Sequence, residues 1–235
     1  MTRAAFVVLA GGSGTRVGAG VNKVYLPLAG RKVISWSFVQ AAQVPEVDHF
    51  VLVTRSEDVA LARGILDEEV GDLDVEVVVG GATRHGSEQA ALDLLRPRIE
   101  AGEVEVVAVH DGARPLAGPA LIGSVIRAAA SAGGALPGLP ARDLLPVGDA
   151  PAGALVRVQT PQAFRAKDLL LAYEAAAAKG FEGTDTASSV EEFSGLAVQV
   201  VPGSRRNLKV TYPHDLLLAE RLLAERLPGG GPAAR

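Results

Sequence analysis

The sequence has no cysteine. This absence excludes disulfide bonds, thiolate catalysis and cysteine-based zinc sites, and it is compatible with a reducing compartment, so we expect a cytoplasmic protein. Aromatic residues make up only 4% of the chain, and the formal net charge is −4. Because nucleic-acid surfaces rely on a basic field and stacking aromatics, we expect no nucleic-acid partner.

Long apolar runs are missing as well. No stretch approaches the ~20 apolar residues that a membrane helix needs. The run 4–10 is short for a signal-peptide core, and glycines follow it where a cleavage motif should stand. We therefore expect a buried first strand and no membrane association.

What the chain does contain is a regular alternation of apolar, β-branched runs with helical patterns over 235 residues. The runs are continuously apolar, as in strands that are covered on both faces. This alternation predicts an α/β fold with a single doubly wound, mainly parallel sheet. The expected strands are 5–9, 50–54, 75–79, 104–110, 135–139, 155–159 and 197–201. The expected helices are 33–43, 57–69, 87–99, 119–132, 166–179, 185–193 and 213–227.

Changes in composition indicate how the chain is organised. We expect one domain over residues 1–227. The stretch 140–158 is rich in Pro, Gly and Ala and is interpreted as an irregular excursion within that domain. The tail 228–235 has a similar composition and is expected to be disordered.

The first expected strand runs directly into a glycine-rich loop that carries two cations. Residues 10–16 read Ala-Gly-Gly-Ser-Gly-Thr-Arg, and Lys23 follows seven residues later. Glycines let backbone N–H groups approach phosphate oxygens, while Arg and Lys supply full positive charge. The segment predicts a cradle for a nucleoside triphosphate, formed by Ala10, Gly11, Gly12, Gly14, Arg16 and Lys23.

Other kinds of glycine loop fit less well. A dinucleotide-binding motif needs a helix that begins within the glycines, but no helical period begins before about Val33. Arg55 could still bind a 2′-phosphate, so an NADP-dependent dehydrogenase stays open as an alternative. A Walker loop is excluded, because no Gly-Lys-Ser/Thr follows. Ser13 does not form a nucleophile elbow, since Thr15 takes the place of its last glycine.

Polar motifs follow two further expected strands, at the sheet edge where ligands bind. Gly80 and Gly81 precede Arg84 and Ser87. Ser87 could cap the next helix, or its hydroxyl and the nearby backbone could contact a pyrimidine base, and the two roles are compatible.

Asp111 ends the fourth expected strand, directly after His110, which we expect to be packed rather than catalytic. A carboxylate beside a phosphate cradle suits Mg²⁺, which takes one or two carboxylates together with phosphate oxygens. The alternative is an internal pair between Asp111 and Arg114.

Three later polar segments have structural or functional interpretations. Residues 160–164 read as loop or cap, and Thr184 or Asp185 could cap the following helix. Lys209 stands among strand-like residues, where a lysine must extend to solvent or bind an anion.

Together these motifs resemble the 2-C-methyl-D-erythritol 4-phosphate cytidylyltransferases of the non-mevalonate isoprenoid pathway. The resemblance runs in order from about Phe6 to Leu223. The ribitol-phosphate cytidylyltransferases share several motifs, but the stretch 184–188, followed by Val190-Glu191, is nearer to the methylerythritol group. Two alternatives stay open: the same chemistry on another alditol phosphate such as ribitol 5-phosphate, and a nucleotide-binding protein without catalysis.

The resemblance implies transfer of a cytidylyl group from CTP, with Mg²⁺ as cofactor and small molecules as substrates. Lys23, Lys209 and Arg16 would be catalytic, and Asp111 would hold the metal. The implied nucleotide contacts are Ala10, Gly11, Gly12, Gly14, Gly80, Gly81, Arg84, Ser87, Asp111 and Ala113. The implied contacts to the acceptor are Arg114, Arg142, Arg157, Thr160, Thr184 and Asp185.

The chain departs from the family after residue 140. Leu144 stands where the family usually has threonine, and the segment to Gln159 is shorter than the family's β-arm. That arm carries dimer contacts, and one of its arginines reaches the substrate phosphate of the partner subunit. Arg157 is the nearest candidate for this arginine, and we expect a possible homodimer weakened by the short arm.

Overall fold

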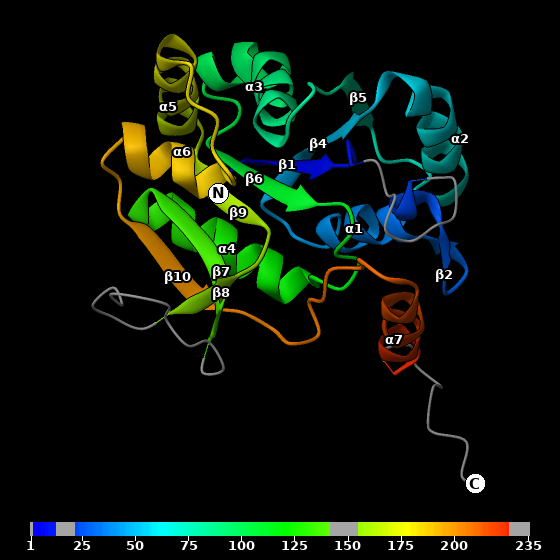
Figure 1. Cartoon of the computed structure of the whole chain (residues 1–235). Coiled ribbons are helices and arrows are strands. Elements are labelled where there is room, and N and C mark those ends of the chain that lie inside the picture. The colour runs from blue at the N-terminus through cyan, green and yellow to red at the C-terminus, as the bar shows by residue number, and fades with distance from the viewer. Residues whose placement is uncertain (1, 13–21, 142–154, 226–235) are drawn as a thin grey trace, which may run out of the picture.

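The computed structural model describes residues 2–12, 22–141 and 155–225, and Figure 1 shows the arrangement of their elements. Of the expected excursion 140–158, only the two ends are described, and the expected tail 228–235 lies outside the described residues. None of the helices described has the length and apolar character needed to cross a membrane.

A mixed, mainly parallel sheet forms the centre of the protein. Its strand order is β10-β7-β9-β6-β1-β4-β5, and β8 pairs with β7. Strand β1 pairs parallel with both β4 and β6, so it lies in the interior of the sheet. The bounds are β1 (Ala4–Leu9), β4 (Val47–Thr54), β5 (Val75–Val79), β6 (Val106–Asp111), β7 (Gly134–Pro140), β8 (Val156–Val158), β9 (Gln162–Arg165) and β10 (Val198–Pro202).

Helices cover both faces of the sheet, which confirms the expected α/β fold (Figure 1). Each expected helix is present, although several ends differ by two or three residues. The helices are α1 (Val33–Ala41), α2 (Val59–Glu69), α3 (Arg84–Glu100), α4 (Pro119–Ala132), α5 (Ala166–Lys179), α6 (Thr186–Phe193) and α7 (Pro213–Ala224). Two 3₁₀ turns, η2 (Lys23–Tyr25) and η3 (Ser56–Asp58), and a short hairpin of β2 (Pro27–Leu28) and β3 (Arg31–Lys32) complete the described elements.

The core has two main layers because alternate residues of β1 point to opposite faces. Phe6 and Val8 belong to the cluster that includes Phe38 of α1, together with residues of α2 and α4. Val7 belongs to the other cluster, with Leu95 of α3 and residues of α5 and α6. A smaller cluster holds α7 against β2 and the start of α1. Burial on both faces explains why the central strands are continuously apolar.

Strand β9 corrects the sequence prediction. Residues 160–164 were interpreted as loop or cap, but Gln162–Arg165 is a strand between β6 and β7. It pairs antiparallel with both neighbours. A strand of four residues that leads directly into a helix has too few positions to show a strand period.

Candidate active site

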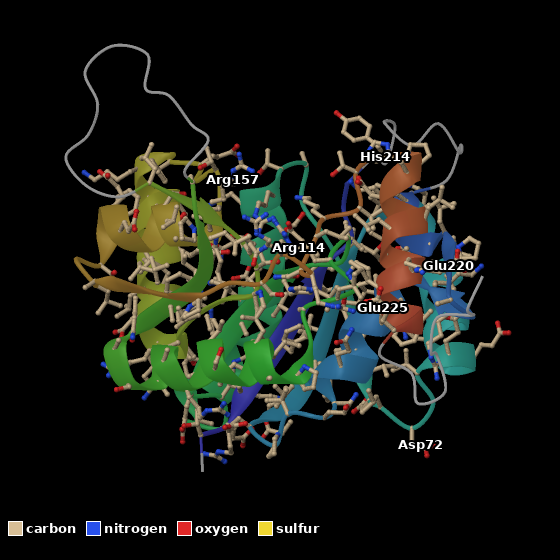
Figure 2. The ribbon with its side chains drawn as sticks, turned by 90° about the horizontal axis from the view of Figure 1, so that it is seen from below. Asp72, Arg114, Arg157, His214, Glu220 and Glu225 are labelled. Atoms are coloured by element: carbon tan, nitrogen blue, oxygen red, sulfur yellow. The ribbon has the colours of Figure 1, made fainter. Side chains whose placement is uncertain are left out.

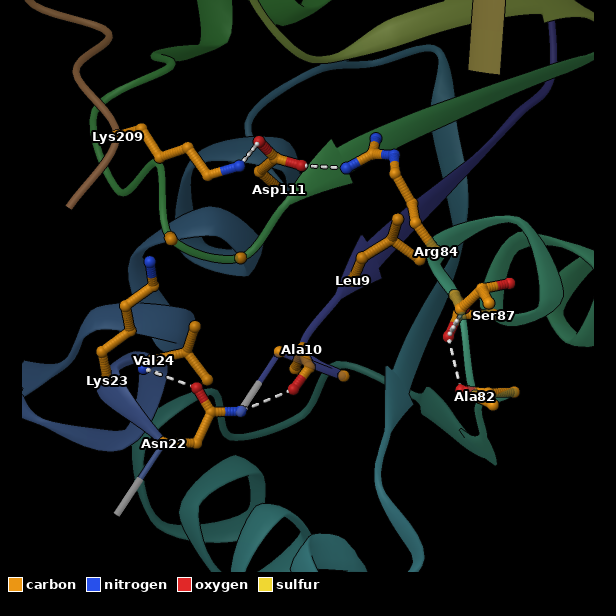
Figure 3. Close-up of a pocket in the computed structure, with 16 residues that line it drawn as sticks. Leu9, Ala10, Asn22, Lys23, Val24, Ala82, Arg84, Ser87, Asp111 and Lys209 are labelled. Carbon is orange, nitrogen blue, oxygen red and sulfur yellow. Dashed lines mark hydrogen bonds and ion pairs between the residues drawn. The ribbon is translucent and has the colours of Figure 1, made fainter. Parts of the chain in front are cut away.

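A cavity of about 520 Å³ opens beside the carboxyl ends of β1 and β6. Ligands bind at this edge in doubly wound sheets. Figure 3 shows Lys23 and Lys209 on one side of it and Arg84 and Ser87 on the other, with Asp111 between Lys209 and Arg84. The expected site residues that line the cavity are Ala10, Gly11, Gly12, Lys23, Gly81, Arg84, Ser87, Asp111, Ala113 and Lys209.

Gly80 and Gly81 are required where the end of β5 meets the first turn of α3. A Cβ on Gly80 would lie 2.6 Å from Ser87 Oγ, and one on Gly81 would lie 2.8 Å from the backbone of Gly86. Both distances are shorter than real Cβ contacts. These glycines therefore allow close packing of the loop, and their contacts to a cytosine base stay a prediction.

Helix α3 begins three residues earlier than expected. Its N-cap is Thr83, whose Oγ1 accepts a hydrogen bond from the N–H of Gly86 at 3.1 Å. The prediction that Ser87 caps this helix was therefore wrong, because Thr83 offers a hydroxyl at the true first turn. Ser87 lies inside the helix, where its Oγ donates to the carbonyl of Thr83 at 2.9 Å.

Lys23 is held at the cavity by a 3₁₀ turn that its neighbour Asn22 caps. The side chain of Asn22 is buried and donates to the carbonyl of Ala10 at 2.6 Å, while its Oδ1 accepts from the N–H of Val24 at 3.4 Å. Asn22 thus ties the start of the glycine loop to the turn that carries Lys23. The sequence analysis missed this residue, although an asparagine before a short turn is a known capping signal.

Three cationic side chains meet at the carboxylate of Asp111. Arg84 Nη1 lies 2.5 Å from Oδ1, and Lys209 Nζ lies 2.8 Å from Oδ2. Arg114 Nε lies 3.5 Å from Oδ2, so the internal pair considered as an alternative is present as one of three. Residues distant in the sequence therefore converge on one carboxylate.

Electrostatics keeps this carboxylate ionised. Burial alone would raise the pKa of Asp111, but the charges of Arg84 and Lys209 outweigh it and hold that pKa well below its usual range. With Lys23 also lining the cavity, cations outnumber carboxylates there. The site therefore favours a polyanionic ligand such as a triphosphate.

His110 and Thr160 are buried residues that support Asp111 through hydrogen bonds. Burial lowers the pKa of His110 to about 4, so its ring is neutral at pH 7. Its Nε2 lies 3.0 Å from the carbonyl of Arg114, which can only accept, so Nε2 donates and Nδ1 accepts from the hydroxyl of Thr160 at 3.1 Å. The same hydroxyl oxygen accepts from the N–H of Asp111 at 3.0 Å. Thr160 therefore orients Asp111, and its contact with an acceptor stays a prediction.

The described residues that were expected to bind the acceptor lie outside the cavity lining, whereas most of those expected to bind the nucleotide belong to it. Asp185 caps α6: its Oδ1 accepts from the N–H of Ser188 at 3.0 Å and its Oδ2 accepts from Gln162 Nε2 at 2.9 Å. Thr184 is exposed, and Arg157 lies on the exposed strand β8. Figure 2 shows Arg157 near the edge of the molecule. None of the five described acceptor residues lines the cavity; they are Arg114, Arg157, Thr160, Thr184 and Asp185.

Three expected site residues, Gly14, Arg16 and Arg142, lie outside the described residues. Their assigned roles stay predictions.

Sequence relatives of this chain cover nearly its full length. The family model for 2-C-methyl-D-erythritol 4-phosphate cytidylyltransferase matches residues 4–225. The chain is 39% identical to the enzyme of that name from Cereibacter sphaeroides, over 95% of this chain and 98% of the relative. It is 37% identical to the one from Geotalea uraniireducens, over 94% and 97%.

Solved structures agree with the sequence relatives. The 4-diphosphocytidyl-2C-methyl-D-erythritol synthase of Anaerococcus prevotii superposes with a TM-score of 0.79 at 28% identity, covering 94% of this chain and 96% of that one. The 2-C-methyl-D-erythritol 4-phosphate cytidylyltransferase of Thermus thermophilus gives a TM-score of 0.68 at 30% identity, covering 94% and 98%. The chain belongs to the 2-C-methyl-D-erythritol 4-phosphate cytidylyltransferase family.

Proposed function

We propose that this protein transfers the cytidylyl group of CTP to 2-C-methyl-D-erythritol 4-phosphate and releases pyrophosphate. The observation that carries the proposal is the convergence of Lys23, Arg84 and Lys209 on one cavity, beside the glycine backbone of residues 11–12. Membership of the family supports it and argues against the dehydrogenase considered from the sequence.

The chemistry needs positioning and charge neutralisation more than proton transfer. A phosphate oxygen of the acceptor forms a bond to the α-phosphorus of CTP in line, and the bond from that phosphorus to the β-bridging oxygen breaks, so pyrophosphate leaves. A phosphate monoester is already an anionic nucleophile, so no general base is required. Lys23 and Lys209 would stabilise the negative charge that is shared among the phosphoryl oxygens in the transition state.

Lys209 is suited to move between two partners. Its side chain is 42% exposed, and its Nζ lies 2.8 Å from Asp111 Oδ2. When CTP enters, this lysine can turn toward a phosphate, while Arg84 continues to neutralise Asp111. The ion pair with Asp111 would then keep the flexible lysine at the cavity before the substrate arrives.

We propose Asp111 as the protein ligand of Mg²⁺. The described residues contain no cluster of three or more His, Asp and Glu, so they do not form an all-protein cage. One ionised carboxylate at the cavity fits the kind of magnesium site in which phosphate oxygens and waters supply the other ligands. When bound, the ion would neutralise charge on the triphosphate.

An assay of pyrophosphate release tests the function. We expect turnover with CTP, Mg²⁺ and 2-C-methyl-D-erythritol 4-phosphate, and its loss when the metal is removed with a chelator. Turnover with ribitol 5-phosphate alone would refute the acceptor. Binding of CTP without product from either acceptor would favour the non-catalytic alternative.

We further propose a homodimer in the cytoplasm. Apolar side chains of Val156, Val158 and Val200 are 37–47% exposed on β8 and β10, and Arg157 lies between the first two. A second copy that covers these strands would bring Arg157 to its interface. Light scattering over a range of concentrations should give the mass of two chains, and a mass of one chain at all concentrations would refute this proposal.

A further inference from the structure

A buried carboxylate near the cavity has no role in the chemistry described above. Glu88 lies on α3, one turn after Arg84, and is only 2% exposed. Glu88 directly follows Ser87 in the sequence, and no motif there indicates a function for it. Burying a carboxylate costs free energy of folding unless the group is paired and hydrogen-bonded. The partners of Glu88 therefore show how its burial is stabilised.

Glu88 and Asp111 hold the guanidinium of Arg84 between them. Arg84 Nε lies 2.8 Å from Glu88 Oε1, and Nη1 lies 2.5 Å from Asp111 Oδ1. The second of these contacts is visible in Figure 3. One carboxylate belongs to a helix and the other to the end of β6, so the arginine is fixed from two elements.

Glu88 is itself held by two hydroxyl groups from other helices. Thr186 of α6 donates to Oε1 at 3.0 Å, and Tyr173 of α5 donates to Oε2. Burial raises the pKa of Glu88, and the charge of Arg84 opposes that rise. These partners leave the carboxylate little freedom to rotate, so it is a rigid anchor for a long side chain.

Arg84 keeps an unused donor group in this arrangement. Its buried Nη2 has no hydrogen-bond partner among the described residues. A buried donor without a partner costs stability. An arginine fixed at both other nitrogens, with donors unused, is better explained by a ligand than by stability alone.

We propose that Glu88 is a positioning residue, which fixes the guanidinium of Arg84 against Asp111 before CTP enters the cavity. The proposal rests on the proposed function and on Arg84, which lines the cavity, as one of the nucleotide contacts that the family resemblance implies. Its physical basis is preorganisation: a side chain that is already ordered loses less freedom when the ligand binds.

A double-mutant cycle on CTP binding tests this proposal. The variants are Glu88→Gln, Arg84→Gln and the double variant, with CTP and Mg²⁺ titrated by calorimetry. Glutamine keeps the shape and can still bond to both hydroxyls, but it lacks the charge that orients Arg84. We expect Glu88→Gln to weaken CTP binding about tenfold, and to have no further effect once Arg84 is replaced.

A matched control is available at the opposite end of the sheet. Glu46 is 9% exposed and its Oε1 lies 2.7 Å from Arg127 Nη1, so it is another carboxylate of low exposure paired with an arginine. Glu46→Gln should leave CTP binding unchanged. Steady-state kinetics should show that Glu88→Gln raises the KM for CTP more than the KM for the acceptor phosphate.

Several outcomes would overturn the proposal. Unchanged CTP binding in Glu88→Gln, or losses from the two single changes that simply add, would mean that Glu88 does not act through Arg84. If Glu88→Gln fails to fold by circular dichroism, Thr186→Val replaces it, because that change removes one support and keeps the charge. We then expect Thr186→Val to weaken CTP binding in the wild type but not in the Arg84→Gln variant. Unchanged CTP binding in Thr186→Val would refute the proposal. A wild type that binds CTP without turnover would refute the proposed function instead, since the cycle measures binding only.

Discussion

At the scale of single residues, the candidate site depends on charges that are placed before the substrate binds. Asp111 holds Lys209 and Arg84, and Asn22 fixes the turn that carries Lys23. Charged groups that are already oriented need no reorganisation during the reaction, which is why preorganised donors contribute strongly to catalysis.

Lys23→Ala should reduce turnover much more than it reduces stability. Loss of a preorganised donor typically costs about 3–4 kcal/mol of transition-state stabilisation, which corresponds to a fall in kcat of roughly 10²–10³-fold. Pyrophosphate release measures this effect, and circular dichroism checks the fold. Lys167→Ala is the control, because Lys167 is exposed on α5 and does not line the cavity. Wild-type turnover in Lys23→Ala would contradict its role.

Thr160→Val should destabilise the protein, since it removes the hydroxyl between His110 and Asp111. The N–H of Asp111 would lose its acceptor at 3.0 Å in a buried position. Such a loss costs about 1–3 kcal/mol. Urea unfolding measures the change, and Thr160→Ser, which keeps the hydroxyl, should be close to the wild type. Equal stability of the valine and serine variants would refute the hydrogen-bond arrangement.

At the scale of secondary-structure elements, the short strand β9 connects two halves of the sheet. It lies between β6 and β7, and Thr160 stands two residues before it, so the position of β9 also places the hydroxyl that accepts from the N–H of Asp111. Phe164 of β9 is fully buried and fills the space above Gly134 of β7. The packing of these two strands therefore links the fold to the site.

Gly134→Ala should be destabilising because the space beside this glycine is already filled. A Cβ there would lie 2.7 Å from Cδ1 of Phe164. Overpacking of this kind typically costs about 1–3 kcal/mol. Gly64→Ala in α2 provides the contrast, since a Cβ at Gly64 meets nothing within 4 Å and alanine is the better helix former. The Tm should fall for Gly134→Ala and rise for Gly64→Ala. A shift of both Tm values in the same direction would contradict the packing described.

At the scale of the whole molecule, helices on both faces bury the centre of the sheet, and polar and charged side chains are buried together with the apolar ones. His110 is an important case, because it is buried in its neutral form. A buried group that must stay neutral links the stability of the entire fold to pH.

Stability should therefore fall on acidification below about pH 6.5. Above that value His110 is neutral in both the folded and the unfolded chain, so it contributes no pH dependence. Between 6.5 and about 4 only the unfolded chain takes up its proton, which favours unfolding by about 2 kcal/mol between pH 7 and pH 5. The low pKa of Asp111 adds a further loss below about pH 4, where the unfolded carboxyl becomes protonated.

Urea unfolding at pH 7 and pH 5 measures this dependence. His110→Gln should be less stable at pH 7, since it loses the packed ring, but its stability should change less between the two pH values. An equal change in the variant and the wild type would show that other groups cause the acid loss. Burial also lowers the pKa of His85, so some pH dependence should remain.

Much of the site was predictable because chemistry-bearing residues follow strands, and strand ends meet at one edge. Ala10, Gly11, Gly12, Lys23 and Asp111 were assigned to the nucleotide on this basis, and the family resemblance added Lys209. All six residues line one cavity. Asn22 was missed although its capping of the turn at Lys23 is a local signal. The contacts of Glu88 with Tyr173 and Thr186, and those of Thr160 with His110 and Asp111, were missed because the partners are distant in the sequence. Local patterns carry no information on such partners.

The sequence by itself determined the α/β class, most of the strands and helices, and the family, because periodicity and the order of motifs are local properties of the chain. The tertiary structure alone decided that β9 enters the sheet antiparallel and that three cations meet at Asp111. It also decided that Tyr173 and Thr186 hold Glu88 beside Arg84. The physical reason is that these features arise from packing and charge pairing between segments that only the folded chain brings together.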